Sequence, residues 1–194
     1  MKSADSPAAF GDDSGAEIAF AGRSNSGKSS ALNAIVGRNA LARTSRTPGR
    51  TRLVNLFELE PGRRLVDLPG YGYARVPAAM RGEWERLMEG YFAGRESLAG
   101  LVLVVDARRG VGDSDRTMLE YAAVRGCPVH VLLTKADKLG RNDARESLKS
   151  ARAALSVRAG VQLFSAESGE GVDTAQGAID AMLAGRRQKI PGDP

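Results

Sequence analysis

The sequence of 194 residues contains little of what several common protein classes need. Its single cysteine, Cys127, rules out an internal disulfide framework and fits a reducing compartment such as the cytoplasm. Its single histidine, His130, stands inside an apolar run, and no Cys/His spacing suggests a zinc site. Aromatic residues make up only 5% of the chain, so a surface that stacks nucleic-acid bases is not evident.

Long hydrophobic runs are also missing. No apolar run approaches the roughly 20 residues needed to span a bilayer, and no basic segment followed by an apolar one marks a signal peptide. We therefore expect a cytoplasmic protein with no membrane partner, and we expect a monomer. The formal charge of +5 permits a polyanionic partner but does not require one.

Apolar runs typical of strands alternate with helical stretches, which predicts an α/β fold with a mainly parallel six-stranded sheet covered by helices on both faces. Strands are predicted at 17–22, 53–58, 63–67, 100–106, 128–134 and 161–164. Helices are predicted at 27–37, 79–94, 113–125, 141–158 and 171–184. The second and third strands are joined by a turn too short for a crossover, so they form an antiparallel hairpin. The expected organisation is a flexible leader at 1–15, one domain at 16–185 and a basic tail at 186–194.

Residues 22–29 match the phosphate-binding loop pattern G-x-x-x-x-G-K-[ST], and they stand between a predicted strand and a predicted helix, as this pattern requires. The glycines let successive backbone N–H groups point at a phosphate chain, and the helix adds the positive end of its dipole. Lys28 is expected to reach the β- and γ-phosphates, and Ser29 to offer its hydroxyl to Mg²⁺. The predicted phosphate site is Gly22, Arg23, Ser24, Asn25, Ser26, Gly27, Lys28 and Ser29.

A second motif, Thr-Lys-Ala-Asp at 134–137, directly follows another apolar run. The Asp137 carboxylate can accept two hydrogen bonds from the N1–H and amine of guanine, a pair of donors that adenine lacks. Ligands in such sheets bind beyond the carboxyl ends of the strands, so both motifs can meet one guanine nucleotide. A backbone N–H after the sixth strand could donate to guanine O6. The predicted base site is Thr134, Lys135, Ala136 and Asp137 with Phe164, Ser165 and Ala166.

Two segments between these motifs complete the prediction. Asp67 ends a strand and can hold Mg²⁺ directly or through a water, and Gly70 lets its N–H approach a γ-phosphate closely. In the loop at 47–52, we favour Thr51 over Thr47 as a further Mg²⁺ ligand, because Thr51 abuts the strand. The predicted nucleotide contacts here are Gly49, Arg50, Thr51, Arg52, Leu53, Asp67, Leu68, Pro69 and Gly70. The predicted catalytic residues are Lys28, Thr51 and Gly70, and the predicted metal ligands are Ser29, Thr51 and Asp67.

These residues together resemble a translation-factor-type GTPase. More narrowly, Arg-Thr-Pro-Gly-Arg-Thr at 46–51 and Val-Asp-Leu-Pro-Gly-Tyr-Gly-Tyr-Ala at 66–74 resemble the bacterial EngB (YsxC/YihA) family, within the TrmE-Era-EngA-EngB-Septin-like superfamily. The match continues through Trp84, Tyr91, Arg95, Leu98 and residues 106–110. The resemblance implies a P-loop G domain that binds GTP and GDP with Mg²⁺. It also implies a role in assembly of the large ribosomal subunit, through its rRNA and proteins, and in normal cell division and septation.

Three positions bear on the expected mechanism. Tyr71 stands where Ras-like GTPases place the glutamine that orients the attacking water, so slow intrinsic hydrolysis is expected. Thr134 stands where most GTPases have Asn and is expected to bridge the phosphate loop less well, which predicts micromolar nucleotide affinity. Asn25 is either a turn residue or a ligand that holds K⁺ near the β/γ bridge, where the cation would stabilise transition-state charge.

Other interpretations remain open at this point. A P-loop small-molecule kinase would need an acceptor site and would leave Asp137 unexplained, and a nucleotide-binding module without turnover is a third hypothesis. Arg141, Arg145, Lys149 and Arg152 recur at helical spacing and form either a solvated face or a contact for RNA phosphates. Tyr71 and Tyr73 are candidates for partner contact. The residues Trp84, Leu87, Met88 and Tyr91 are expected to belong to the core.

Overall fold

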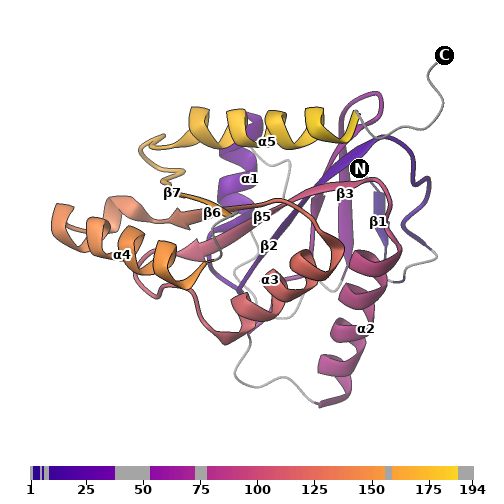
Figure 1. The fold of residues 1–194 in the computed structure, drawn as a ribbon, viewed down its shortest axis with the longest axis horizontal. Helices are drawn as coiled ribbons and strands as arrows, with labels where there is room; N and C mark the ends of the chain where they lie inside the picture. The colour runs from indigo at the N-terminus through magenta and orange to yellow at the C-terminus, as the bar shows by residue number, and fades with distance from the viewer. Residues whose placement is uncertain are drawn as a thin grey trace.

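The computed structural model describes residues 2–4, 6, 9–37, 53–72, 78–155 and 159–187. In this part of the chain the strands form one seven-stranded sheet with the order β1-β3-β4-β2-β5-β6-β7 (Figure 1). The strands are β1 (Lys2–Ala4), β2 (Ala16–Gly22), β3 (Val54–Glu60), β4 (Arg63–Asp67), β5 (Leu98–Asp106), β6 (Val129–Thr134) and β7 (Ala159–Leu163). The predicted α/β fold and its six strands are confirmed, and β1 is an addition at one edge.

Strand β2 lies in the middle of the sheet and pairs in parallel with both β4 and β5. Strands β6 and β7 extend the parallel part beyond β5. Strands β3 and β4 form the predicted antiparallel hairpin, and β1 pairs with β3, also antiparallel. Gly62 in the hairpin turn has a φ of 75°, a left-handed conformation that glycine adopts without a steric cost. The carboxyl ends of β2, β4, β5 and β6 therefore lie along one rim.

Five helices cover the two faces of the sheet in the described part of the chain: α1 (Lys28–Val36), α2 (Ala78–Gly94), α3 (Asp113–Arg125), α4 (Arg141–Ala154) and α5 (Val172–Arg187). Helices α1 and α5 lie on one face, and α2, α3 and α4 lie on the other (Figure 1). Alternate residues of each buried strand pack toward opposite faces. Ile18 and Phe20 of β2 join the core under α1 and α5, whereas Ala19 and Ala21 join the core under α2, α3 and α4.

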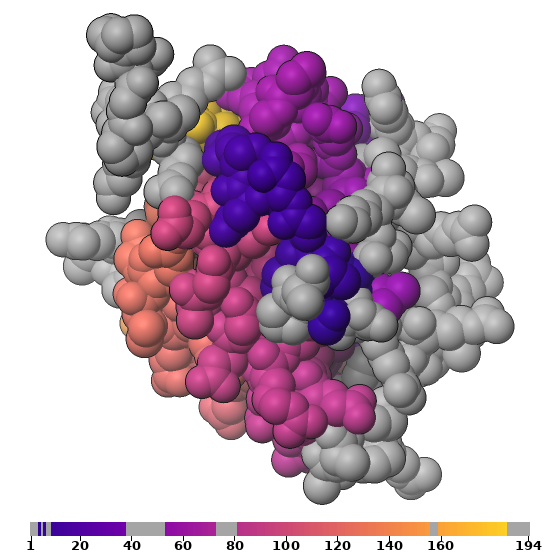
Figure 2. All heavy atoms as spheres, turned by 90° about the vertical axis from the view of Figure 1, so that its right-hand side faces the viewer, coloured from indigo at the N-terminus to yellow at the C-terminus, as the bar shows by residue number. Residues whose placement is uncertain are grey.

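Residues 1–15 were expected to form a flexible leader, which stays a prediction. Among the described residues of this segment, the side chains of Ala4 and Phe10 are buried, whereas residues 11–15 are exposed. Phe10 is 5% exposed and meets Tyr91 edge-on at 5.3 Å between ring centroids. Arg95 donates to the carbonyl oxygens of Gly11 at 3.1 Å and Asp12 at 2.7 Å. Figure 2 shows this N-terminal segment at the surface between the β3–β4 hairpin and α2. The side chain of Arg95 therefore holds the small and polar residues around Gly11 and Asp12, although it is more than 80 residues away in the sequence.

The same arginine pairs with a buried carboxylate below this segment. Glu17 is fully buried, and its Oε1 lies 2.5 Å from Arg95 Nη2 and 2.8 Å from Arg64 Nε. Tyr91 donates a further hydrogen bond to Glu17 at 3.3 Å. Buried charges persist in a core only when they are paired and hydrogen-bonded, as Glu17 is. This network lies at the amino end of β2 and leaves the opposite rim free for the site.

The predicted helical core residues are also confirmed: Leu87, Met88 and Tyr91 are buried, and Trp84 packs against the same cluster. Helix α5 continues to Arg187, past the expected boundary at 185, and the rest of the predicted basic tail lies outside the described residues. No helix in the described ranges is long and apolar enough to cross a bilayer.

Candidate functional site

The loop at 22–29 connects the carboxyl end of β2 to the first turn of α1. Asn25 and Gly27 have φ values of 62° and 94°, so the loop passes twice through the left-handed region. The N–H groups of the first helical turn have no intrahelical partner and carry the positive end of the helix dipole. Such a loop-to-helix junction presents donors to an anion, as the sequence pattern predicts.

The first glycine of this loop is required by close packing. A Cβ on Gly22 would lie 2.6 Å from the Val104 carbonyl oxygen and 2.7 Å from Ser26 Oγ. A Cβ on Gly70, by contrast, would lie 3.6 Å from Ser24, which is an ordinary contact. Because Gly22 has no Cβ, the end of β2 can pack closely against Val104 of β5 and Ser26 of the loop. At Gly70, by contrast, this structure has space for a Cβ.

Lys28 and Asp67, which the sequence assigns to phosphate and Mg²⁺, form an ion pair between Lys28 Nζ and Asp67 Oδ1. Lys28 opens α1, and Asp67 ends β4 with 5% of its surface exposed. The two groups come from segments 39 residues apart, and the parallel pairing of β2 with β4 brings them together. A phosphate chain at this place would compete with Asp67 for Lys28 and would release the carboxylate for other contacts.

The site fits a divalent cation only in combination with a phosphate ligand. In the described part of the chain, no group of three or more His, Cys, Asp or Glu residues could hold a metal ion. Ser29 and Asp67 offer a hydroxyl and a carboxylate, which are the hard oxygen donors that Mg²⁺ prefers. Mg²⁺ usually takes one or two protein ligands and fills its other positions with water and phosphate oxygens, so this small donor set suits it.

The predicted base motif directly contacts the phosphate loop. Thr134 Oγ1 lies 2.5 Å from the Ser26 carbonyl oxygen and 3.0 Å from that of Val105, and its one proton can serve either. Lys135 Nζ donates to the Asn25 carbonyl oxygen at 2.6 Å. Thr134 is 3% exposed. The threonine therefore reaches the loop, and the expectation that it bridges the loop less well than an asparagine stays a prediction.

Asp106, at the end of β5, holds this junction together and was not among the predicted site residues. Its Oδ2 lies 2.9 Å from Lys135 Nζ and 2.7 Å from Arg108 Nη2. Although burial acts in the opposite direction, hydrogen bonds from Arg108 and Lys135 hold the pKa of Asp106 well below its ordinary value. A signal was available in the sequence, since Asp106 follows a buried apolar strand on the same rim as Asp67 and Asp137.

The predicted base selector is oriented by its predicted neighbour. Ser165 Oγ donates to Asp137 Oδ1 at 2.6 Å, and Lys138 Nζ lies 2.9 Å from Asp137 Oδ2. The hydrogen bond from Ser165, followed by that from Lys138, lowers the pKa of Asp137, so the group is a carboxylate at neutral pH. Asp137 can therefore act as a double acceptor toward a ligand.

The turn after β7 packs against the base motif through the backbone. Ala136 N–H donates to the Phe164 carbonyl oxygen at 3.2 Å, and Phe164 is fully buried. The Ser165 N–H donates to the Glu170 carbonyl oxygen at 2.9 Å. The N–H groups of Phe164 and Ser165 are used inside the protein, and among the three predicted residues only the Ala166 N–H has no acceptor in the described structure. Of the backbone N–H groups predicted to contact the base, Ala166 is therefore the candidate.

Tyr71 is buried, so its predicted role as a partner contact is wrong for this structure. Its ring is 5% exposed, and its hydroxyl donates to Asp115 Oδ1 at 2.9 Å. Its carbonyl oxygen accepts from the Ser24 N–H at 2.9 Å. Arg23 Nη2 pairs with Asp115 Oδ2 at 3.0 Å. Tyr71 therefore ties the segment after β4 to the phosphate loop through its backbone and to α3 through its hydroxyl.

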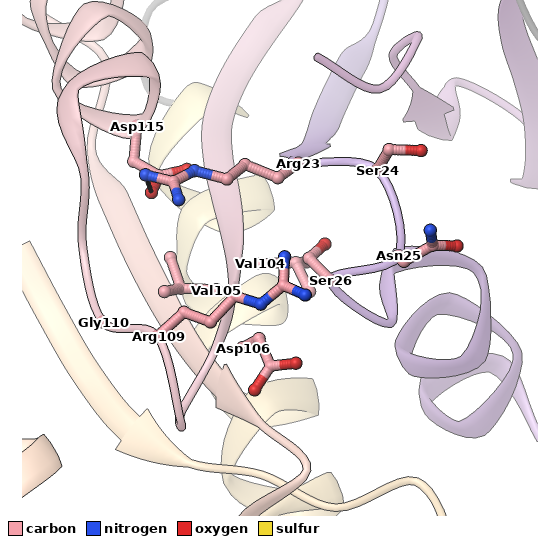
Figure 3. Close-up of a pocket in the computed structure, with 10 residues that line it drawn as sticks. All are labelled: Arg23, Ser24, Asn25, Ser26, Val104, Val105, Asp106, Arg109, Gly110 and Asp115. Carbon is pink, nitrogen blue, oxygen red and sulfur yellow. Dashed lines mark ion pairs between the residues drawn. The ribbon is translucent and has the colours of Figure 1, made fainter. Parts of the chain in front are cut away.

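A hollow lies behind the phosphate loop, between it and the segment that joins β5 to α3 (Figure 3). Arg23 extends across it toward Asp115, and Arg109 extends toward Ser26 (Figure 3). Ser26 Oγ and Arg23 Nε are buried there with no hydrogen-bond partner among the described residues. The hollow is lined by Arg23, Ser24, Asn25, Ser26, Val104, Val105, Asp106, Arg109, Gly110 and Asp115. Its lining shares Arg23, Ser24, Asn25 and Ser26 with the predicted phosphate site but contains neither Lys28 nor Asp137.

The remaining predicted residues contribute less to the described geometry. Leu68 is 1% exposed, and its N–H donates to the Phe20 carbonyl oxygen at 3.0 Å. The Pro69 carbonyl oxygen accepts from Trp84 Nε1 at 3.2 Å, and Leu53 is 38% exposed before β3. Five residues considered in the loop at 47–52, and Tyr73 of the segment after β4, lie outside the described residues: Thr47, Gly49, Arg50, Thr51, Arg52 and Tyr73.

Comparison with known proteins identifies the family of this chain. A family model described as 50S ribosome-binding GTPase matches residues 17–135. A protein of Stenotrophomonas maltophilia named probable GTP-binding protein EngB is 53% identical over 175 residues, covering 88% of each chain. Its namesake in Xanthomonas axonopodis pv. citri is 50% identical over 189 residues, covering 94% of this chain and 88% of its own.

Solved structures support the fold. A crystal structure of a probable GTP-binding protein engB superposes with a TM-score of 0.71 at 22% identity, covering 88% of this chain and all of the other. Aquifex aeolicus Era gives a TM-score of 0.65 at 19% identity, covering 92% of this chain and 57% of Era. These likenesses concern the fold, whereas the family model and the close relatives concern the family. The chain belongs to the EngB family of GTP-binding proteins.

Proposed function

We propose that this chain binds GTP and GDP with Mg²⁺ at the rim formed by β2, β4, β5 and β6, and that it hydrolyses GTP slowly. The contact of Thr134 and Lys135 with the carbonyl oxygens of Ser26 and Asn25 carries this proposal. It fixes the base-selecting motif to the phosphate-binding loop, so one nucleotide can engage Asp137 and Lys28 together. In that complex Lys28 neutralises phosphate charge, and Asp137 accepts hydrogen bonds from the base.

Guanine selection is tested by competition and by one substitution. Excess ATP should not displace GDP, because adenine lacks the two donors that Asp137 accepts. Asp137→Asn should weaken GDP binding about 100-fold and improve binding of a xanthine nucleotide, since an amide both donates and accepts and xanthine has an acceptor in place of the amine. Displacement by ATP would instead favour a small-molecule kinase.

Slow hydrolysis is proposed because of Tyr71. Its hydroxyl is buried against Asp115, so it cannot orient a water at a γ-phosphate as a glutamine does. We expect the pure protein to turn over GTP on the time scale of minutes to hours, near the roughly 10⁻⁴ to 10⁻³ s⁻¹ of intrinsic small-GTPase rates. Turnover above about 1 s⁻¹ without a partner would contradict this part of the proposal.

Moderate nucleotide affinity is proposed because the Asp67 carboxylate competes with the nucleotide phosphates for Lys28. Lys28 is engaged by Asp67 in this structure, and that ion pair must open before Lys28 can bind phosphate. When bound, Mg²⁺ would neutralise phosphate charge, with Ser29 and Asp67 as its protein ligands and Thr51 as a further predicted one. Calorimetric titration should give micromolar dissociation constants for GDP. Removal of Mg²⁺ by EDTA should weaken GTP binding in the wild type and have less effect in Asp67→Asn.

A potassium requirement is proposed at Asn25. Its left-handed φ of 62° turns the loop, and its carbonyl oxygen is taken by Lys135, which leaves the side-chain amide for other contacts. An amide oxygen there could hold K⁺ beside developing phosphate charge. Turnover should fall when Na⁺ replaces K⁺, and Asn25→Ala should remove the difference. Equal rates in the two salts would mean that Asn25 only forms the turn.

The cellular role is proposed from the family. The matching model is described as 50S ribosome-binding GTPase, which supports action on the large ribosomal subunit precursor. That the chain acts there as a monomeric cytoplasmic switch is part of the same proposal. A requirement for this step in cell division and septation belongs to the same proposal. Co-sedimentation with 50S particles should be stronger with a non-hydrolysable GTP analogue than with GDP. Equal recovery in both states would argue against a switch.

A further inference from the structure

Helix α4 carries four basic residues along one flank: Arg141, Arg145, Lys149 and Arg152. At about 100° per residue they fall within an arc of about 80° and extend about 16 Å along the axis. All four are exposed, and none pairs with another described residue. The acidic residues of the helix, Asp143 and Glu146, lie at least about 60° outside this arc. We call these four residues the α4 basic flank.

This arrangement is unfavourable for the helix itself. Arg141, Arg145 and Lys149 are like charges four residues apart, which repel one another on a helix surface. Arg141 also stands in the first turn, next to the positive end of the helix dipole, and Gly140 provides no side-chain cap. Residues that destabilise their own helix and provide no evident structural gain are expected at functional surfaces.

The rest of α4 is fixed to the body of the protein. Ala151 is buried, Leu148 and Leu155 pack against the core, and Ser147 Oγ donates to the Ala107 carbonyl oxygen at 2.8 Å. Figure 1 shows α4 at the end of the sheet that carries β7. The apolar side chains of α4 therefore pack against the protein core. They are not available for insertion into a membrane, which a basic amphipathic helix needs in order to bind lipid.

We propose that the α4 basic flank binds the phosphate backbone of double-stranded RNA. The exposed positions of α4 carry no aromatic or large apolar side chain, so base stacking lacks its usual residues, and a protein hot spot would have arginines but no apolar or aromatic anchor. A straight row of cations suits the closely facing phosphates along the deep, narrow major groove of A-form RNA. The choice of RNA over DNA rests on the proposed ribosomal function, whereas the choice of a phosphate backbone rests on the helix.

The test is binding of a 20-base-pair RNA duplex to the full chain by fluorescence anisotropy over a range of salt concentrations. Removing two phosphate contacts in Arg145→Gln/Lys149→Gln should reduce the slope of log K against log salt by about 1.8 and lower affinity at least about tenfold at low salt. The matched control is Arg86→Gln/Arg116→Gln, which removes two exposed arginines from α2 and α3 and should leave the slope unchanged.

Each outcome decides the proposal. Equal slopes for the wild type and the α4 variant, or equal losses in the control variant, would overturn it. Binding to phosphatidylserine vesicles in preference to the duplex would overturn it in favour of a membrane. A DNA duplex of the same sequence should bind more weakly, and equal binding would overturn the choice of RNA. GDP titration of the same variants separates the two proposals, because GDP affinity should stay at the wild-type value whether or not RNA binding is lost.

Discussion

The hydroxyl of Tyr71 donates a hydrogen bond of 2.9 Å to the carboxylate of Asp115, and both side chains are buried. Burial, followed by the negative charge of Asp115, raises the pKa of Tyr71 well above its ordinary value, so the hydroxyl remains a donor at all physiological pH values. The same carboxylate pairs with Arg23 of the phosphate loop and accepts from the Gly112 N–H at 2.9 Å. One buried carboxylate thus connects three segments that border the proposed nucleotide site.

Tyr71→Phe removes this hydrogen bond and keeps the ring. Because Asp115 is charged and fully buried, we expect the free energy of unfolding to fall by about 1.5 kcal/mol in urea denaturation. The proposed slow rate of GTP hydrolysis should not fall further, since in this proposal the hydroxyl does not orient the water. Tyr121→Phe is the control, because the described structure shows a ring contact and no hydrogen bond for Tyr121. Equal destabilisation by both substitutions would show that the bond to Asp115 contributes nothing.

The fold was largely predictable because its strands have strong local signals. Strand β5 is buried along its whole length and reads as an apolar run, and the alternation of strands with helices fixes the parallel arrangement. The packed segment before β2 was not predictable in the same way. Its residues are small and polar, and its position depends on Arg95, more than 80 residues away in the sequence. A single sequence contains no local signal for such a contact.

In the candidate site, too, features with a local sequence signal could be predicted, and features that depend on long-range contacts could not. The loop at 22–29 and the motif at 134–137 are continuous patterns with a chemical meaning, so both could be predicted. The carboxylates of Asp106 and Asp115 act through partners from other segments, Lys135 and Arg23. Their positions at the end of β5 and the start of α3 are visible in the sequence. Their partners become evident only when the rim is assembled.

Gly112→Ala tests the packing of Arg23 over α3. A Cβ on Gly112 would lie 1.6 Å from Arg23 Nη2, so the guanidinium must move away from Asp115. Moving the far end of a flexible side chain costs little in itself, but the buried Asp115 then loses a charged partner. We expect the free energy of unfolding to fall by about 1–3 kcal/mol.

Gly177→Ala provides the matched control for that substitution. No atom lies within 4 Å of a Cβ built on Gly177, which is exposed inside α5. Alanine should therefore stabilise the protein by about 0.5–1 kcal/mol through helix propensity. Destabilisation at both positions would mean that the effect at Gly112 arises from alanine in general and not from displacement of Arg23.

Ser165→Ala tests how the base selector is kept ionised. The hydrogen bond from Ser165 is the largest of the effects that lower the pKa of Asp137 below its ordinary value of 3.8. A lowered pKa means that the carboxylate is present above it and is lost only as the pH falls through it, so wild-type GDP affinity should be constant from about pH 8 to pH 5. Without the serine hydroxyl, affinity should fall about tenfold and its decline with acid should begin at higher pH.

Ser168→Ala is the control for this experiment, since Ser168 belongs to the same turn and its hydroxyl accepts only a weak contact from the Glu170 N–H at 3.4 Å. GDP titration at several pH values should give the wild-type profile for this variant. A parallel loss in both variants would indicate that the turn had rearranged.

Cys127 should be a slow-reacting thiol. Burial raises the pKa of its thiol to about 12, although Arg125 acts in the opposite direction. Because the thiolate is the reactive form, labelling by a maleimide at pH 7.5 should be far slower in the folded protein than in urea. The folded rate should keep rising with pH through pH 9, where an ordinary cysteine levels off. A plateau near pH 9 would show that the thiol is not held in its protonated form by burial.

Thr134→Val tests whether the hydroxyl at this position connects the base motif to the phosphate loop. Valine keeps the shape of the side chain but leaves the Ser26 and Val105 carbonyl oxygens without the donor that now lies between them. We expect a loss of about 1–2 kcal/mol in unfolding free energy and about tenfold weaker GDP binding, because the base motif then keeps only the Lys135 hydrogen bond to the loop. The control is Thr117→Val, whose exposed hydroxyl bonds within α3 at 3.3 Å. If GDP affinity is unchanged in Thr134→Val, the hydroxyl does not connect the two motifs, and Lys135 alone positions the base site.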